Sequence, residues 1–309
     1  MGIKLLAAVC SDKGCVRQNN EDNFCLNGHY LKREQMDGGG LFKCRVSTPA
    51  TFAVCDGMGG EEAGEEASLL SVSRIAEYMA ENKSLYDVEE IKRFLRSGCM
   101  EVAEQAKKKG NHSGSTVAIL SAAPQGMRAI NMGDSRIYRL SKGELQQLSM
   151  DHTEMHRLIE QGRLTPEQAK THPKRHMIYQ YWGMPLDRAP FTPHVSDTIP
   201  YKHKDRFLLC SDGLTDMLSD EEIAHVLAKA ARVEQIAEEL VRQAKQKGGH
   251  DNVTVCVVEV LDESKAELII KHANLQTLYV RRKRMAKMLL AICLLDCYLV
   301  FVWLDMLLH

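Results

Sequence analysis

The chain has 309 residues, which is enough for one large domain with an appendage or for two domains. Its 40 basic residues nearly balance 41 acidic ones, so bulk charge gives no reason to expect nucleic acid as a partner. None of the ten cysteines forms a C-x-x-C pair, and none has an arginine six positions later, which excludes the loop of cysteine-dependent phosphatases. The N-terminal apolar run is too short for a secretory signal, so we expect free thiols in a reducing compartment.

The N-terminal part predicts two strands and a polar connection between them. Apolar runs predict strands at residues 5–9 and 23–26. The segment 17–22 between them carries one cation and two adjacent carboxylates, and by itself it is typical of a charged hairpin turn. Residues 27–50 contain three consecutive glycines, Gly38-Gly39-Gly40, which are expected to form a flexible hairpin loop.

The next apolar run ends in an aspartate. The apolar run at residues 52–55 predicts a buried strand whose last residue is Asp56, and Gly57 follows it before helices predicted near 61–81 and 87–109. A carboxylate beside an unhindered backbone carbonyl is a pair of ligands that hard divalent cations prefer. One such pair is weak evidence, because Asp-Gly is also a common turn.

Three more aspartates occur at ends of predicted strands. These strands cover residues 115–122, 126–132, 135–141, 144–148, 206–211 and 252–260. Asp134 lies between the strands predicted at 126–132 and 135–141. Asp212 follows the strand at 206–211, and Asp251 precedes the strand at 252–260. Four aspartates in such positions favour one shared cation site, and an oxygen-only set of ligands selects Mg²⁺, Mn²⁺ or Ca²⁺ over zinc.

Residues 150–200, here called the insertion, differ in composition from their surroundings. They are polar and rich in His and Pro, with short helices predicted at 153–162 and 165–171, which is typical of a segment that covers a site rather than of a core element. The insertion contains two pairs of histidines four residues apart, His152 with His156 and His172 with His176. Neither pair fits His-Glu-x-x-His, so we expect these histidines to face solvent.

The pattern as a whole predicts an α+β fold. Two further helices are predicted near 220–230 and 233–247. Closely connected strands favour antiparallel pairing, and strands flanked by pairs of helices pack well as two sheets with the helices outside.

These motifs resemble one family, the type 2C (PPM) metal-dependent Ser/Thr protein phosphatases in their bacterial form. The matching segments span about residues 5–260 in the order of the family, and they are Arg17-x-x-x-Glu21-Asp22, Asp56-Gly57-Met58-Gly59-Gly60, Gly114-Ser115-Thr116, Gly133-Asp134-Ser135-Arg136, Asp151-His152-Thr153, Ser211-Asp212-Gly213 and Asp251-Asn252. The resemblance implies a four-layer α-β-β-α sandwich with metals in a cleft at one end.

The resemblance also implies a role for each site residue. Asp56 would bridge two Mn²⁺ or Mg²⁺ ions, with the carbonyl of Gly57 on the second ion, and Asp212 and Asp251 would complete the shell of the first. A weaker third-metal site would consist of Asp134, Asp212 and Asp216. The residues that would hold metal-bound waters are Glu21 and Asp22. Arg17 would bind the substrate phosphate, because a guanidinium can bind two phosphate oxygens in parallel.

The expected activity is hydrolysis of phosphoserine and phosphothreonine in proteins by a water that bridges the two metals, which needs no protein nucleophile. The expected substrates are those of a bacterial Ser/Thr kinase. Two alternatives stay open: a catalytically silent pseudophosphatase that acts as a membrane-linked binding or sensing module, and a phosphatase for other phosphoesters. Eukaryotic relatives resemble Asp-Gly-His where this chain has Met58, so the proton donor has no assignment, and we expect a metal-bound water.

The C-terminal residues lie outside the phosphatase pattern, which we assign to residues 1–262. Residues 263–287 form a basic linker that ends near Arg281-Arg282-Lys283-Arg284, and residues 288–308 are apolar apart from acidic positions such as Asp296. Basic residues before a short apolar span predict a cytoplasmic catalytic domain anchored in the membrane by one C-terminal helix. The alternative is an apolar helix that packs on the domain or self-associates.

Overall fold

The computed structural model describes residues 2–59, 63–81, 85–170, 172–187 and 190–261. The predicted linker and the predicted apolar helix of the C-terminal region lie outside these residues. Within the described ranges, no helix combines the length and the apolar character needed to cross a membrane.

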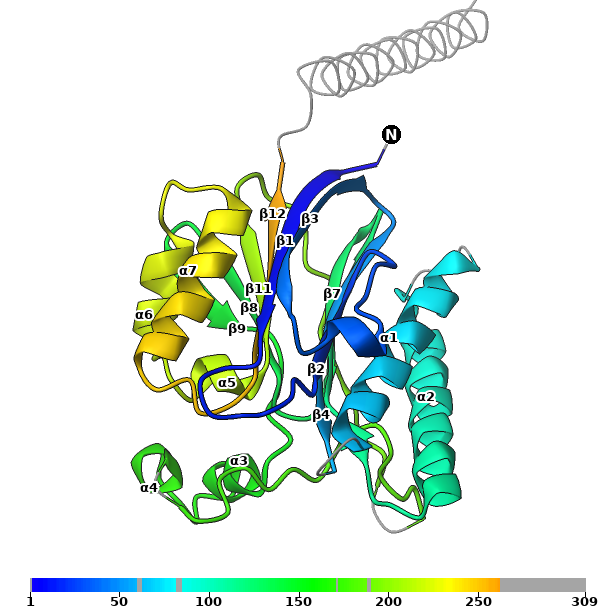
Figure 1. Ribbon diagram of the computed structural model, residues 1–309. Helices are drawn as coiled ribbons and strands as arrows, with labels where there is room; N and C mark the ends of the chain where they lie inside the picture. Colours follow the sequence, from blue (N-terminus) through cyan, green and yellow to red (C-terminus); the bar gives the residue numbers. More distant parts are fainter. Residues whose placement is uncertain (1, 60–62, 82–84, 171, 188–189, 262–309) are drawn as a thin grey trace, which may run out of the picture. The chain divides into compact units, whose positions relative to one another are not determined.

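Two antiparallel sheets form the centre of the domain (Figure 1). The first sheet has the order β3 (Gly40–Ser47), β1 (Lys4–Asp12), β12 (Val253–Val260), β11 (Arg206–Cys210), β8 (Arg136–Ser141) and β9 (Glu144–Gln147). The second sheet has the order β10 (His194–Val195), β7 (Gly126–Met132), β6 (Val117–Ala123), β4 (Ala50–Met58) and β2 (Asp22–Leu26), and the short strand β5 (Gly114–Ser115) pairs with the end of β4.

Helices cover the outer face of each sheet (Figure 1). The second sheet packs against α1 (Ala63–Ala80) and α2 (Val88–Lys109), and the first sheet packs against α6 (Asp220–Leu227) and α7 (Val233–Gln246). Shorter helices are η1 (Arg33–Gln35), α3 (Glu154–Glu160), α4 (Pro166–Lys170) and α5 (Asp212–Thr215). The prediction of two antiparallel sheets flanked by helices is confirmed.

Successive side chains of a strand point to opposite faces of the sheet. Apolar side chains on both faces therefore produce this layering of sheets and helices. In β11, Phe207 and Leu209 join the cluster between the two sheets, whereas Leu208 and Cys210 join the cluster beneath α6 and α7. Both faces of the strand are therefore buried, which explains its continuous apolar run.

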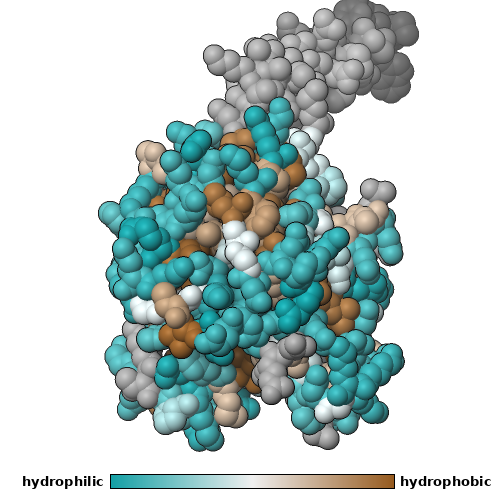
Figure 2. Space-filling view, in the orientation of Figure 1, coloured by the Kyte–Doolittle hydropathy of each residue, from teal (hydrophilic) through white to brown (hydrophobic). Residues whose placement is uncertain are grey.

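Local signals fix the ends of the helices. Asp87 caps α2 by accepting a hydrogen bond from the backbone N–H of Glu90 at 2.9 Å, and the helix ends at Gly110 in a left-handed conformation. Ser219 and Glu222 form a capping box at the start of α6. On the face shown in Figure 2 the described surface is mainly hydrophilic, with apolar side chains scattered over it.

Strand β3 differs from the prediction, which assigned no strand after the hairpin loop at Gly38-Gly39-Gly40. Its side chains alternate between half-buried and exposed, with Phe42 and Val46 packed against the central cluster and Lys43 and Arg45 exposed. The charged residues interrupt the apolar run because β3 lies at the edge of the first sheet. An edge strand of this kind gives a weak sequence signal.

The end of the insertion belongs to the core, although the sequence predicted only a cover over a site. Trp182 is fully buried, and its ring lies 5.6 Å from that of Phe94 on α2. A Cβ atom at Gly98 of α2 would approach this indole to 2.4 Å, so the absence of a side chain there lets the ring pack on the helix. Trp182 therefore anchors the returning end of the insertion.

Candidate metal centre

The acidic residues of the second sheet lie on neighbouring strands. Asp22 on β2 is the register partner of Asp56 on β4. Asp22 is buried, and its Oδ2 accepts a hydrogen bond from Ser211 Oγ at 2.7 Å, whereas its Oδ1 is buried with no hydrogen-bond partner. Burial raises the pKa of Asp22 to about 7, although hydroxyl hydrogen bonds oppose the shift.

Asp56 lies inside its strand, so the expectation that it is the last strand residue is wrong. The strand continues to Met58, because Gly57 pairs with Ser115 on β5. Burial raises the pKa of Asp56 well above its usual value. The pKa is raised further by the nearby carboxylates of Asp22, Asp212, Asp134 and Asp251. Carboxylates from separate parts of the sequence thus act on one another at this point.

The first sheet supplies the opposite side of the centre. Asp251 lies two residues before β12. Asp212 begins α5 directly after the N-cap residue Ser211, so Asp212 occupies a helical first turn and not a strand-end turn. Burial raises the pKa of Asp212 to about 6, and the neighbouring acids Asp216 and Asp251 contribute. The closeness of the Asp56 carboxyl acts on the pKa of Asp212 in the opposite direction.

Glycines allow α1 to approach this end of the second sheet. The backbone N–H of Gly57 donates to the carbonyl of Glu21 at 3.1 Å. A Cβ atom at Gly57 would lie 2.0 Å from the carbonyl oxygen of Gly64, and one at Gly64 would lie 2.7 Å from the carboxyl carbon of Glu21. Burial raises the pKa of Glu21, and its own backbone N–H donates to Asn252 Oδ1 at 2.8 Å.

Arg17 lies at the edge of the carboxylates. Its Nη2 is 2.7 Å from Asp251 Oδ2, and half of its side chain is exposed. A guanidinium held by one carboxylate keeps further N–H donors for a ligand that arrives from solvent. The position is therefore compatible with the phosphate-binding role predicted from the sequence.

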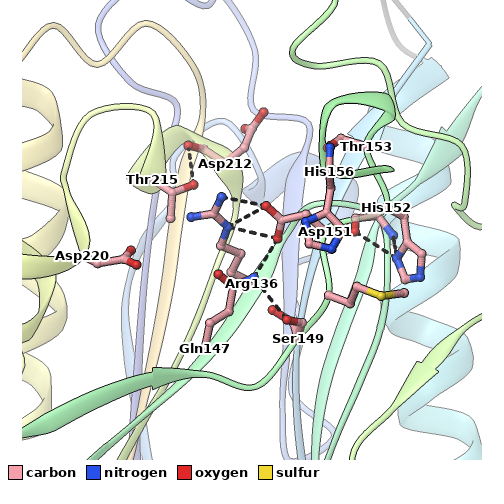
Figure 3. A network of polar contacts seen from close by, with 12 residues as sticks. Arg136, Gln147, Ser149, Asp151, His152, Thr153, His156, Asp212, Thr215 and Asp220 are labelled. Atoms are coloured by element: carbon pink, nitrogen blue, oxygen red, sulfur yellow. Dashed lines mark hydrogen bonds and ion pairs between the residues drawn. The ribbon is translucent and has the colours of Figure 1, made fainter. Parts of the chain in front are cut away.

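A polar network around Arg136 and Asp151 (Figure 3) lies close in the chain to the turn that carries Asp134. Arg136, two residues later, donates to both carboxylate oxygens of Asp151, with Nε–Oδ1 at 3.0 Å and Nη2–Oδ2 at 2.6 Å. Gln147 also donates to Asp151, and Arg136 donates to the hydroxyl of Tyr138. Arg136 and Asp151 both belong to the motifs of the sequence, but the family resemblance gave neither of them a role.

His152 is buried, so the prediction that it faces solvent is wrong. Its Nδ1 lies 3.2 Å from the backbone of Gly133, and its Nε2 lies 3.2 Å from the carbonyl oxygen of Thr192. The imidazole therefore joins both ends of the insertion to the turn that precedes Asp134. Burial lowers the pKa of His152, which favours the neutral ring.

His176 is half exposed, but its ring faces carboxylates and not only solvent. Its Nδ1 lies 3.7 Å from Asp212 Oδ2, and its Nε2 lies 3.7 Å from Asp216 Oδ2. The four-residue spacing to His172 did not predict this arrangement, because the actual neighbours of His176 lie on another element far along the chain.

The residues fit a centre for divalent cations. Asp22 Oδ1 is an unpaired buried oxygen, and burying several carboxylates together is costly unless they are protonated or compensated by positive charge. Carboxylate and backbone carbonyl oxygens are the ligands that Mg²⁺ and Mn²⁺ prefer. The predicted site residues gathered here are Arg17, Glu21, Asp22, Asp56, Gly57, Asp134, Asp212 and Asp251, with Asp216 next to Asp212.

Residues 41–257 match the protein phosphatase 2C family. The chain is 31% identical over 255 residues to the serine/threonine phosphatase stp of Listeria welshimeri, covering 81% of this chain and 93% of that protein. It is 34% identical over 260 residues to the serine/threonine protein phosphatase PstP of Mycobacterium tuberculosis, covering 82% of this chain and 45% of that protein. The chain belongs to the protein phosphatase 2C family, as its motifs predicted.

Solved structures show the same similarity. The crystal structure of the M. tuberculosis phosphatase PstP/Ppp superposes with a TM-score of 0.69 at 31% identity, over 84% of this chain and 100% of that chain. The catalytic domain of PstP in complex with two manganese ions gives a TM-score of 0.67 at 31% identity, with the same coverage. The relationship supports dependence of this family member on divalent metal.

The raised carboxyl pKa values predict how pH changes the stability of the metal-free protein. Asp22 and Asp212 bind protons more tightly when folded, with pKa values of about 7 and 6 against roughly 4 when unfolded. The free energy of unfolding contributed by these groups therefore falls as pH rises from about 4 to 7. Because Mn²⁺ competes with the same protons, its apparent affinity should rise over this range.

Thermal unfolding at pH 5 to 8, with chelator or with Mn²⁺, measures both effects. We expect the increase in Tm caused by Mn²⁺ to be larger at pH 8 than at pH 5, and Asp22→Asn to reduce this dependence on pH. An equal increase at every pH would contradict the description of the centre.

Proposed function

We propose that this protein is a metal-dependent phosphatase that removes phosphate from phosphoserine and phosphothreonine in proteins. The observation that carries the proposal is the meeting of Asp56 and Asp212, from different sheets, in one group of carboxylates. Membership of the protein phosphatase 2C family and relatives named serine/threonine phosphatases support it.

The proposed ligands follow from the positions of the residues. Asp56 would be shared between two Mn²⁺ or Mg²⁺ ions, with the Gly57 carbonyl on the second ion and Asp212 and Asp251 on the first. Glu21 and Asp22 would bind through water. The residues of a weaker third site would be Asp134, Asp212 and Asp216. A similar structure that contains two manganese ions supports the pair of ions.

When bound, such ions lower the pKa of an attacking water and neutralise the phosphoryl oxygens. Arg17 would bind the phosphate, and Asp251 orients its guanidinium through the contact at 2.7 Å. Ser211 holds the buried carboxylate of Asp22 in place by its hydrogen bond. Met58 has no proton to give to the leaving alkoxide, so that proton must come from another group.

Hydrolysis of a phosphothreonine peptide by metal-free protein supplied with Mn²⁺ tests the proposal. We expect chelator to abolish turnover and Asp56→Asn to lower kcat/KM by about 10³-fold or more, because a ligand shared by both ions is lost. Asp197→Asn changes an exposed aspartate of the same domain and should leave turnover within about twofold.

Each other outcome has a definite meaning. Turnover that survives chelation or Asp56→Asn contradicts the metal-dependent mechanism. A folded wild-type protein that binds Mn²⁺ and hydrolyses no phosphoester is a pseudophosphatase. Rapid hydrolysis of small phosphoesters with none of phosphopeptides indicates the alternative substrate class.

The source of the substrates is part of the proposal. The similar phosphatases stp and PstP come from bacteria, and we infer that this protein acts on proteins phosphorylated by a bacterial Ser/Thr kinase. Incubation with the phosphoproteins made by such a kinase should release phosphate in the presence of Mn²⁺. A phosphoprotein that keeps its phosphate under these conditions is not a substrate.

We also propose that residues 288–308 anchor a cytoplasmic catalytic domain to the membrane. The support comes from sequence alone, from the basic run 281–284 placed before an apolar segment. The full-length chain should sediment with membranes after cell lysis, and a chain that ends at Glu263 should stay in the supernatant. If both chains remain in the supernatant, the proposed membrane anchor is wrong.

A further inference from the structure

An apolar side chain lies beside the proposed phosphate-binding arginine. Val16 directly precedes Arg17 in the chain, and 58% of its surface is exposed. Val16 belongs to none of the three apolar clusters that form the core of the described residues. This valine therefore lies on the surface at the edge of the metal centre, next to the guanidinium that contacts Asp251.

The loop of residues 13–19, which carries this valine, is held at both of its ends by one side chain. Asn252 Nδ2 donates to the carbonyl of Lys13 at 3.0 Å and to the carbonyl of Asn19 at 2.9 Å. Asn252 Oδ1 accepts from the backbone N–H of Glu21 at 2.8 Å. Because β12 begins directly after Asn252, the loop is attached to a central strand of the first sheet.

Further contacts fix the first half of the loop. The N–H of Gly14 donates to Asp12 Oδ1 at 2.9 Å, and the N–H of Cys15 donates to the carbonyl of Gly249 at 2.8 Å. Gly14 has a φ of +80°, and a Cβ atom there would lie 2.1 Å from the carbonyl oxygen of Asp251, so the approach needs glycine. None of these contacts uses the valine side chain, and a small polar residue in its place should leave the loop folded.

A substrate held by Arg17 would pass close to Val16. Adjacent Cα atoms of a chain are about 3.8 Å apart, and an extended peptide advances about 3.3 Å per residue. When the phosphate of a phosphorylated residue is on Arg17, the substrate residues one or two positions away can therefore reach Val16. Burial of apolar surface favours such a contact, and a β-branched side chain has few rotamers to lose when the contact forms.

We propose that Val16 is a specificity-determining residue that binds an apolar side chain next to the phosphorylated residue of the substrate. The class of substrate is then a phosphoprotein segment with an aliphatic residue within two positions of the phosphothreonine or phosphoserine. One rigid loop contacts both parts of this segment, because Arg17 binds the phosphate and Val16 binds the neighbouring side chain. The inference rests on the proposed function, since it concerns the substrate of the same site.

Hydrolysis of a set of phosphothreonine peptides by the full-length protein with Mn²⁺ tests the inference. The peptides differ only in carrying leucine or serine at one of the two positions before or after the phosphothreonine. We expect leucine to raise kcat/KM about fivefold over serine at one or more of these positions, through a lower KM, because partial burial of a valine contributes about that factor. Val16→Ser should reduce the advantage of leucine to less than about twofold, whereas Val16→Ile should keep it.

Met100→Ser is the matched control for the loss of an exposed apolar side chain. Met100 is exposed to the same extent, 58%, but it lies on α2, which carries none of the predicted site residues. This variant should keep the preference for leucine. We expect Val16→Ser to unfold at the same temperature as the wild type in the presence of Mn²⁺, since the valine side chain belongs to no core cluster.

Two results would overturn the inference and leave the proposed function intact. One is equal kcat/KM for the leucine and serine peptides at every position, and the other is the same preference in Val16→Ser as in the wild type. Failure to hydrolyse any phosphothreonine peptide would overturn the proposed function and this inference with it, so the two failures are distinguishable.

Discussion

The carboxylates that meet at one end of the two sheets repel one another, and burial removes the water that would otherwise screen them. The effect is visible in the raised pKa values of Asp22, Asp56 and Asp212 and in the buried oxygen of Asp22 that has no hydrogen-bond partner. Protons or cations must compensate these charges. The site therefore destabilises the metal-free protein and offers a set of ligands suited to divalent ions.

The surrounding fold is arranged to hold these groups together. The pairing of β2 with β4 places Asp22 opposite Asp56, and close packing of α1 through Gly57 and Gly64 leaves no room for added side chains. From the other sheet, β11 leads into α5, which begins with Asp212. The cluster of apolar residues between the sheets keeps both contributions at fixed positions, so the strands and the short segments next to them carry the site.

The sequence predicted most strands and helices because their apolar periodicity is strong, as in β11 and α2. Its motifs predicted which aspartates would gather, although the individual roles came from the family resemblance. The edge strand β3 was missed because its lysine and arginine break the apolar run. The burial of His152 and the carboxylate neighbours of His176 were missed, because both depend on the path of the insertion, which a local pattern does not contain.

The central claim is that one pair of divalent ions is held by carboxylates of both sheets. Anomalous diffraction from crystals grown with Mn²⁺ tests it most directly. The account predicts two manganese peaks about 4 Å apart, with Asp56 between them and Asp212 and Asp251 on one ion. Peaks that lie away from Asp56, or that involve residues of one sheet alone, would contradict it.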